Sequence, residues 1–186
     1  MRKILLTSLA ISFFALNLNA QEVDEPEFIG ESLLLRSDNT TVLLEKELTQ
    51  GRTVASTGLV ITGIGKVRSQ IQINGCCAGV KVSKDEDIKI VIRGVDNMTD
   101  PISIIKVFKF DSRRKFRRAE LSSAHIFGSY KNNNLDYVRF TGTKFGTSSY
   151  LLEFSDLEPG EYGITISNPN NIDEKQIVIS TFAVTE

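Results

Sequence analysis

Two adjacent cysteines and one histidine are the residues that could carry nucleophilic or redox chemistry. A thiol enzyme needs a base in contact with its nucleophile, and the spacing of Cys76 and His125 does nothing to favour such a dyad. A serine triad would also have to use His125, and the chain has no Gly-x-Ser-x-Gly elbow. We therefore expect a non-enzymatic protein with no catalytic residue. The alternative is a thiol- or histidine-dependent enzyme that uses Cys76, Cys77 or His125.

The bonding state of the two cysteines stays open at the level of sequence. We expect two free or loosely oxidised thiols, because a disulfide between adjacent residues fits S–S geometry poorly and closes no loop. A vicinal disulfide is the first alternative, and an intermolecular bridge or a metal contact is the second. Zinc needs four ligands, and Cys76, Cys77 and His125 supply three at most.

Seven basic residues lie within 13 positions, from Lys106 to Arg118. If residues 108–110 paired with residues 116–118 around an Asp111-Ser112 turn, these charges would gather at one tip and attract phosphates or sulfates. The ligand would be an anionic glycan, lipopolysaccharide or another surface protein, and not nucleic acid. The alternative is a solvated edge hairpin whose cations prevent sheet aggregation. The candidate anion-binding residues are Lys109, Arg113, Arg114, Lys115, Arg117 and Arg118.

Two further groups of side chains could bind a ligand. An oxygen-rich loop could attract calcium, but it lacks EF-hand spacing and its residues are good turn formers, so we expect neither a metal nor a cofactor. Aromatic residues of the C-terminal half could stack on sugar rings, which makes a glycan-binding module a further alternative. The loop comprises Asn168, Asn170, Asn171, Asp173 and Glu174, and the aromatic group comprises Tyr130, Tyr137, Phe140, Phe145 and Tyr150.

Alternation of apolar and polar residues predicts β-strands along the whole chain after about residue 32. No stretch shows a helical period, and residues 57–65 could be a strand or a buried loop. A Gly-containing turn at 74–79 carries the two cysteines. The predicted strands cover 32–36, 41–45, 67–73, 80–82, 87–95, 102–110, 116–121, 135–141, 149–154, 162–167 and 176–184.

A Pro-Gly turn places Tyr162 at the start of one of these strands. Pro159 presets the turn and Gly160 permits positive φ. In immunoglobulin-like sandwiches a tyrosine placed in this way bonds its hydroxyl to backbone a few residues upstream. Together with many short strands separated by turns, this motif predicts an all-β, antiparallel immunoglobulin-like β-sandwich after an N-terminal signal peptide.

The stretch from Lys109 to Gly163 resembles an uncharacterised family of short exported β-sandwich proteins of Bacteroidetes-type bacteria. The resemblance rests on Phe-Asp-Ser-Arg-Arg-Lys-Phe-Arg-Arg-Ala-Glu-Leu, Lys-Phe-Gly-Thr-Ser-Ser-Tyr and Leu-Glu-Pro-Gly-Glu-Tyr-Gly, with Phe-Ile-Gly-Glu at 28–31. It covers about half of the chain after residue 20. It implies a fold and a location outside the cytoplasm, and it implies no activity.

The first 20 residues have the order of a secretory signal peptide. Arg2 and Lys3 precede an apolar run, and Ala20 closes it before Gln21. We predict a periplasmic or secreted protein with a flexible acidic leader at 21–31 and a sandwich at 32–186, with a seam near 95–101 if there are two small sandwiches. Loss of Arg2 and Lys3 lowers the 22 basic residues to 20, against 23 acidic ones, so the overall charge favours neither nucleic acid nor a membrane. The chain has no second apolar run, so we expect no transmembrane segment after the signal peptide.

Overall fold

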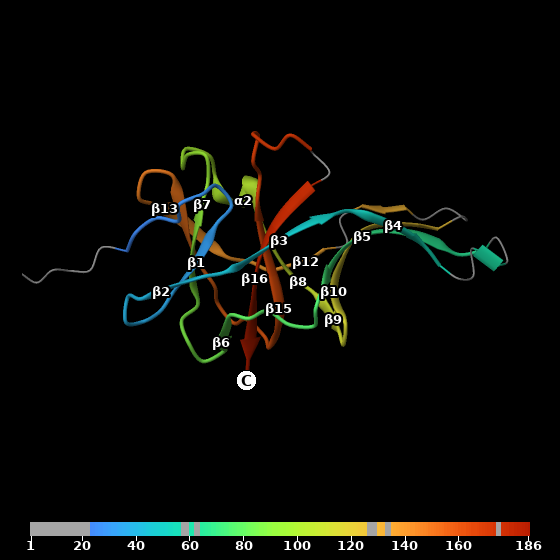
Figure 1. The fold of residues 1–186 in the computed structure, drawn as a ribbon, viewed down its shortest axis with the longest axis horizontal. Coiled ribbons are helices and arrows are strands. Elements are labelled where there is room, and N and C mark those ends of the chain that lie inside the picture. Colours follow the sequence, from blue (N-terminus) through green and yellow to red (C-terminus); the bar gives the residue numbers. More distant parts are fainter. Residues whose placement is uncertain (1–22, 57–59, 62–63, 126–129, 133–134, 174–175) are drawn as a thin grey trace, which may run out of the picture.

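The structure is a computed structural model that describes residues 23–56, 60–61, 64–125, 130–132, 135–173 and 176–186, with the backbone alone for 124–125 and 130–132. The predicted signal peptide lies outside the described residues. Within them the chain is almost entirely β-strand, in three sheets (Figure 1). No helix in this part has the length and apolar character needed to cross a bilayer.

Sheet A forms one layer of a sandwich. Its strand order is β13-β14-β7-β1-β2, and every neighbouring pair is antiparallel. Its strands come from both sides of residues 95–101, so that segment is no seam between two sandwiches. The strands are β1 (Ser32–Leu35), β2 (Thr41–Leu43), β7 (Lys89–Arg93), β13 (Thr141–Phe145) and β14 (Ser149–Glu153).

Sheet B is the second layer, with the order β12-β8-β15-β16-β3. Its pairs along this path are antiparallel, and β6 is added beside β16 in parallel. Sheets A and B enclose the main core, in which Tyr162 stacks on Phe182 with ring centroids 5.3 Å apart. The strands are β3 (Glu45–Gln50), β6 (Lys81–Ser83), β8 (Ile105–Lys109), β12 (Asp136–Tyr137), β15 (Gly160–Ile166) and β16 (Gln176–Thr185). The predicted all-β antiparallel sandwich is confirmed.

Sheet C was not foreseen as a separate layer. Its order is β11-β10-β5-β4, with β9 beside β10. Its base packs on the outer face of sheet B, where Ile71, Ile73 and Ala119 meet Phe108, Phe110 and Ile179 in a second core. The strands are β4 (Arg52–Ala55), β5 (Lys66–Asn74), β9 (Asp111–Arg113), β10 (Phe116–His125) and β11 (Tyr130–Asn132).

The far part of sheet C projects from the sandwich as an arm (Figure 1). We define the arm as β4, β11 and the residues paired with them, 67–70 of β5 and 122–124 of β10. All four residues of β4 are exposed, and residues 66–70 of β5 are only half-buried. The arm therefore extends beyond both hydrophobic cores.

The predicted strand at 102–110 is wrong in its first part. Residues Pro101–Ile104 form the short helix α2, and β8 begins at Ile105. Asp100 caps α2, because its side chain accepts a hydrogen bond from the backbone N–H of Ile102. Proline at the first helical position needs no hydrogen-bond partner, so local capping overrides the alternating pattern here.

The acidic segment before β1 lies against the sandwich, in place of the flexible leader expected from its composition. The Glu25 carboxylate accepts hydrogen bonds from the backbone N–H groups of Thr147 and Ser148 and from the hydroxyl of Ser149 at 2.6 Å. Glu31 is 7% exposed and forms an ion pair with Lys46. Paired carboxylates thus fix residues 25–31 to the turn before β14 and to β3.

The predicted tyrosine corner is present. The Tyr162 hydroxyl donates a hydrogen bond to the backbone carbonyl of Glu158, four residues upstream. Tyr162 is 2% exposed, and burial raises the pKa of its hydroxyl. The corner fixes the entry of β15 into sheet B.

Candidate functional site

The basic segment does not form the predicted hairpin. β8 pairs with β12 and β15 in sheet B, whereas β9 pairs with β10 in sheet C. Arg113 lies opposite Phe116, so the turn falls at Arg114 and Lys115 and not at Asp111-Ser112. Lys106 and Lys109 therefore belong to a different sheet from the other five basic residues.

Most of the candidate anion-binding side chains already have acidic partners. Lys109 pairs with Glu158 at 3.2 Å, and Arg113 and Arg118 share Asp111 at 3.1 and 2.8 Å. Burial raises the pKa of Asp111, but hydrogen bonds from Arg118 and Arg113 outweigh it, and the net pKa is lowered.

Arg117 is the largest departure from the predicted basic tip. It is 1% exposed and forms an ion pair with Glu161 at 3.3 Å, so it cannot contact an external anion. Arg114 and Lys115 are exposed at the turn. The six candidates thus fall into three groups. Arg117 is in a buried ion pair, and Arg114 and Lys115 form a short exposed turn. The remaining three have acidic partners at the surface, namely Lys109, Arg113 and Arg118.

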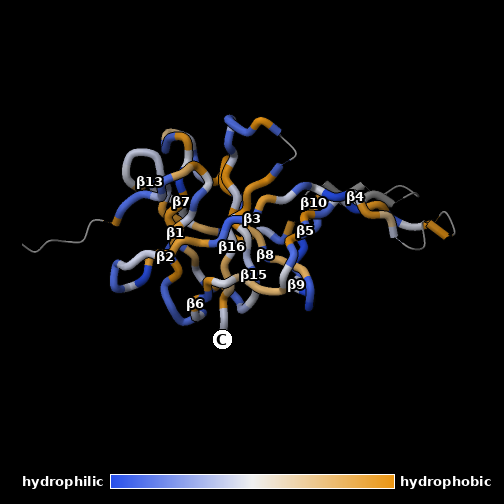
Figure 2. Tube along the Cα trace, in the orientation of Figure 1, coloured by the Kyte–Doolittle hydropathy of each residue, from blue (hydrophilic) through white to orange (hydrophobic). Residues whose placement is uncertain are grey.

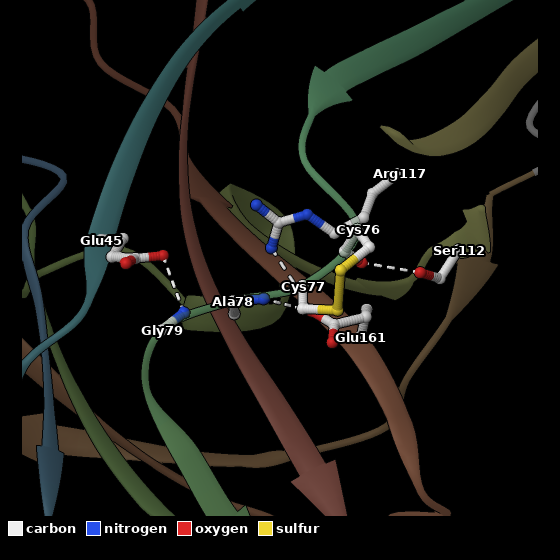
Figure 3. Close-up of a disulfide and its surroundings, with 8 residues drawn as sticks. All are labelled: Glu45, Cys76, Cys77, Ala78, Gly79, Ser112, Arg117 and Glu161. Carbon is white, nitrogen blue, oxygen red and sulfur yellow. Dashed lines mark hydrogen bonds and ion pairs between the residues drawn. A yellow bond between two sulfur atoms is a disulfide. The ribbon is translucent and has the colours of Figure 1, made fainter. Parts of the chain in front are cut away.

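Cys76 and Cys77 form a vicinal disulfide, and the expectation of free thiols is wrong. The bond lies in the loop between β5 and β6, which we call the cystine loop (residues 74–79). Cys77 is exposed and Cys76 is half-buried. The loop holds the two side chains so that their sulfurs meet (Figure 3).

Hydrogen bonds from sheet C fix the first half of the cystine loop. The Ser112 hydroxyl on β9 donates to the carbonyl of Cys76 at 2.7 Å. The Gly75 N–H donates to the carbonyl of Lys115 at 2.9 Å, and Gly75 has a φ of 87°. This left-handed conformation is one that glycine adopts without strain. The loop therefore lies on the β9–β10 turn.

Carboxylates from sheet B fix the second half (Figure 3). The N–H of Ala78 donates to Glu161 on β15 at 2.8 Å, and the N–H of Gly79 donates to Glu45 on β3 at 2.9 Å. Glu161 also receives the buried guanidinium of Arg117 from β10. The cystine loop thus bridges the base of sheet C and the sandwich.

The structure separates the histidine from the cysteines. Phe116 pairs with Asn74 at the cystine-loop end of β5, whereas His125 pairs with Lys66 at the other end. Eight steps along the strand at ~3.3 Å each place the backbones at the two ends about 26 Å apart. A Cys76–His125 dyad is therefore excluded in this fold; the side chain of His125 lies outside the described residues.

The aromatic candidates do not share one surface. Tyr150 is fully buried and its hydroxyl donates to the carbonyl of Thr99. Phe140 is half-buried against the main core, and Tyr137 is 41% exposed. Phe145 is half-buried, and the side chain of Tyr130 lies outside the described residues. Burial of Tyr150 removes a central member of the predicted sugar platform.

The oxygen-rich loop forms a turn in the structure. The side chain of Asn168 accepts a hydrogen bond from the N–H of Asn170 at 2.9 Å, which is the local bonding that makes asparagine a turn former. Glu174 lies outside the described residues. In the part of the chain that the structure describes, no three His, Cys, Asp or Glu side chains are grouped so as to hold a metal ion.

The end of the arm carries a feature that the sequence pattern missed. Val60 and Ile61 are each 75% exposed and Ile64 is 61% exposed, so this part of the segment 57–65 is not a buried loop. Residues 60–61 lie at the far right of Figure 1, and Figure 2 shows hydrophobic colouring there. Such a clustering of exposed aliphatic side chains is a typical mark of an interaction site.

No protein-family model, curated protein or solved structure matches this chain.

Proposed function

We propose that the protein is an exported, non-enzymatic binding module that engages another protein of the cell envelope through the end of its arm. The supporting observation is the exposure of Val60 and Ile61 at the far end of the arm, with Ile64 also exposed three residues further along the chain. Signal-like residues 1–20 support export. The separation of His125 from the two cysteines supports a role in binding over thiol catalysis.

The energetics of the arm favour a bound partner. A sheet without a packed face is at best marginally stable in water, and the four residues of β4 are all exposed. Covering Val60 and Ile61 would remove apolar area from water at ~25 cal/mol per Å². A partner thus gains binding energy from surface that the sandwich itself leaves uncovered.

A protein groove suits this arm better than a lipid bilayer. β4 lies at the edge of sheet C, so one side of its backbone can pair with an added strand. In hydrocarbon the same backbone groups would lack partners at a cost of several kcal/mol each. The polar residues Arg52 and Thr53 on β4 add to that cost.

Photo-crosslinking from the arm tests this proposal. A photoreactive residue at position 61, in cells that export the protein, should give a discrete crosslinked protein product. The pair Val60→Ser and Ile64→Ser should reduce that product by about tenfold or more, since each loses over 1 kcal/mol of apolar contact. No change in overall folding is expected, because both side chains are exposed.

A matched control uses exposed apolar residues of the sandwich. Met98 is 78% exposed and Ile172 is fully exposed, so Met98→Ser with Ile172→Ser should leave the product unchanged. Equal crosslinking from positions 61 and 172, or a product made of lipid alone, would contradict the proposed arm-tip interaction with a protein.

A further inference from the structure

The Cys76–Cys77 disulfide does not act as a structural staple. It joins adjacent residues, so it closes no loop of the unfolded chain and removes almost no chain entropy. The cystine loop has other anchors, namely hydrogen bonds that involve Ser112, Lys115, Glu161 and Glu45. Because this disulfide contributes little to folding, it can be reduced and re-formed in the folded protein.

The bond is open to attack from solvent. Cys77 is exposed and Cys76 is half-buried. Thiol–disulfide exchange requires a thiolate to reach one sulfur, and access decides which sulfur is attacked. The exposure of the two residues therefore favours attack at the Cys77 sulfur, with the Cys76 sulfur as the leaving group.

We propose that Cys76–Cys77 is a reversible two-electron redox site whose reductant is a protein dithiol. A thiolate of the dithiol attacks Cys77 Sγ, which breaks the Cys76–Cys77 bond and forms a mixed disulfide. Cys76 leaves as a thiolate and takes up a proton. The second thiol of the reductant then displaces Cys77, so that the reductant becomes a disulfide and this chain gains two thiols. Reoxidation by an oxidised dithiol protein reverses each step.

The surrounding contacts keep the reduced sulfurs together. Ser112 holds the carbonyl of Cys76, and Glu161 holds the N–H of Ala78 on the other side of the pair. Neither contact depends on the S–S bond. The two thiols consequently stay on neighbouring residues of a fixed loop, where reclosure is intramolecular and has a high effective concentration.

The site also lies where a redox change could reach the arm. The loop follows β5, whose first half belongs to the arm, and Glu161 joins the loop to the buried Arg117 of β10.

Opening the ring frees the Cys77 side chain without removing a core residue. We therefore expect reduction to leave the sandwich folded.

Redox titration of the full processed protein tests the site. The native protein is equilibrated with reduced and oxidised dithiothreitol, alkylated, and analysed by mass spectrometry. Both cysteines should become alkylated in one two-electron step, with Tm changed by less than about 4 °C. Failure to reduce the bond without denaturant, or cooperative unfolding on reduction, would overturn the proposal.

Variants separate a redox role from a structural one. Cys76→Ser with Cys77→Ser should also shift Tm by less than about 4 °C, whereas loss of a structural disulfide costs about 2–5 kcal/mol, which is about 4–20 °C for a chain of this size. In single-cysteine chains, Cys77 (in Cys76→Ser) should react with an aromatic disulfide about tenfold faster than Cys76 (in Cys77→Ser), because its thiol is more exposed. Equal rates would contradict attack at Cys77.

Reoxidation supplies the last test. Reduced protein should reclose at a rate independent of its own concentration. Ser112→Ala should slow reclosure several-fold, because the Cys76 carbonyl loses its partner, while Ser103→Ala, at an exposed position on α2, should not. Disulfide-linked dimers as the main product would overturn the proposal. The proposed arm-tip interaction is independent of this outcome, since it was assigned from Val60, Ile61 and Ile64.

Discussion

Glu25 shows how one carboxylate can fix a polar segment to a sandwich. Burial raises the pKa of Glu25, but hydrogen bonds from Ser149, Thr147 and Ser148 outweigh it and lower the pKa from 4.5 to about 2. A carboxyl whose pKa is lower in the folded than in the unfolded state stabilises the fold above its unfolded pKa. That stabilisation is lost as the pH falls from 4.5 towards 2.

We expect Glu25→Gln to lower the free energy of unfolding by about 2 kcal/mol at pH 7. The difference from the parent protein should shrink as the pH approaches 2, where Glu25 itself is protonated. Urea unfolding at several pH values measures this. Asp24→Asn is the control on the same segment, since Asp24 is exposed and its loss should cost under about 0.5 kcal/mol. A difference that does not depend on pH would rule out the carboxylate as the cause.

At the residue scale, a contact could be predicted from the sequence only when its two partners lie close together along the chain. The corner of Tyr162 was predictable because its acceptor, Glu158, lies four residues away and the Pro-Gly turn sets the geometry. The burial of Arg117 was not, because its partner Glu161 is 44 residues along the chain. The cysteines were placed in the right turn, but their bond depends on a loop conformation that distant contacts fix.

At the element scale, β15 shows how sheet B can be buried on both faces. Tyr162 and Ile164 face the main core, and Gly163 between them faces the second core. A Cβ at Gly163 would lie 2.8 Å from Phe110, 2.9 Å from Phe108 and 3.0 Å from Ile179. The absence of a side chain leaves room for the Phe108, Phe110 and Ile179 side chains, which sheet B contributes to the second core.

Gly163→Ala should therefore displace the Phe108, Phe110 and Ile179 side chains and disturb their packing against β5 and β10 of sheet C. Overpacking of a filled core typically costs about 1–3 kcal/mol, and we expect a loss in this range together with faster amide exchange in β5 and β10. Hydrogen-exchange mass spectrometry measures the second effect. Gly51→Ala is the control, because a Cβ there meets ordinary contacts at 3.6 and 3.9 Å. Unchanged exchange in β5 and β10 would show that Gly163 does not control the packing of the second core.

The period-two pattern predicted most strands well, and its failures have local reasons. β5, β7, β14 and β16 fall within about two residues of their predicted ranges. Alternation places Val91 on the opposite face from Ile90 and Ile92, yet all three are fully buried, since the cross-strand neighbours of Val91 are Leu33 and Leu151. Short exposed strands such as β4 and β9 have no apolar alternation, so the pattern could not reveal them.

At the scale of the whole molecule, the fold class followed from the sequence but the number of layers did not. Alternation indicates that a strand has a buried face, but it does not indicate which other strands pack on that face. The assignment of β8 to sheet B and of β9 to sheet C depends on pairing with β15 and β10. The arm and its apolar end therefore became visible only in three dimensions.

Export is the whole-molecule property on which the proposed function rests. We expect the mature protein to begin at Gln21, because Arg2 and Lys3, the apolar run and Ala20 have the order of a cleaved signal. N-terminal sequencing of protein from envelope and medium fractions measures this. Replacing two leucines of the run, Leu5→Arg and Leu6→Arg, should retain the full-length chain in the cytoplasm. Cytoplasmic protein that keeps Met1 in the parent strain would contradict export.

Strand β16 imposes an order of events on folding. It hydrogen-bonds to β15, β3 and β6, and it supplies Phe182 to one core and Ile179 to the other. A polypeptide still being synthesised can complete neither core until residues 176–185 have left the ribosome. For a protein that is exported as we propose, this order would delay folding in the cytoplasm until the chain has entered a translocation channel.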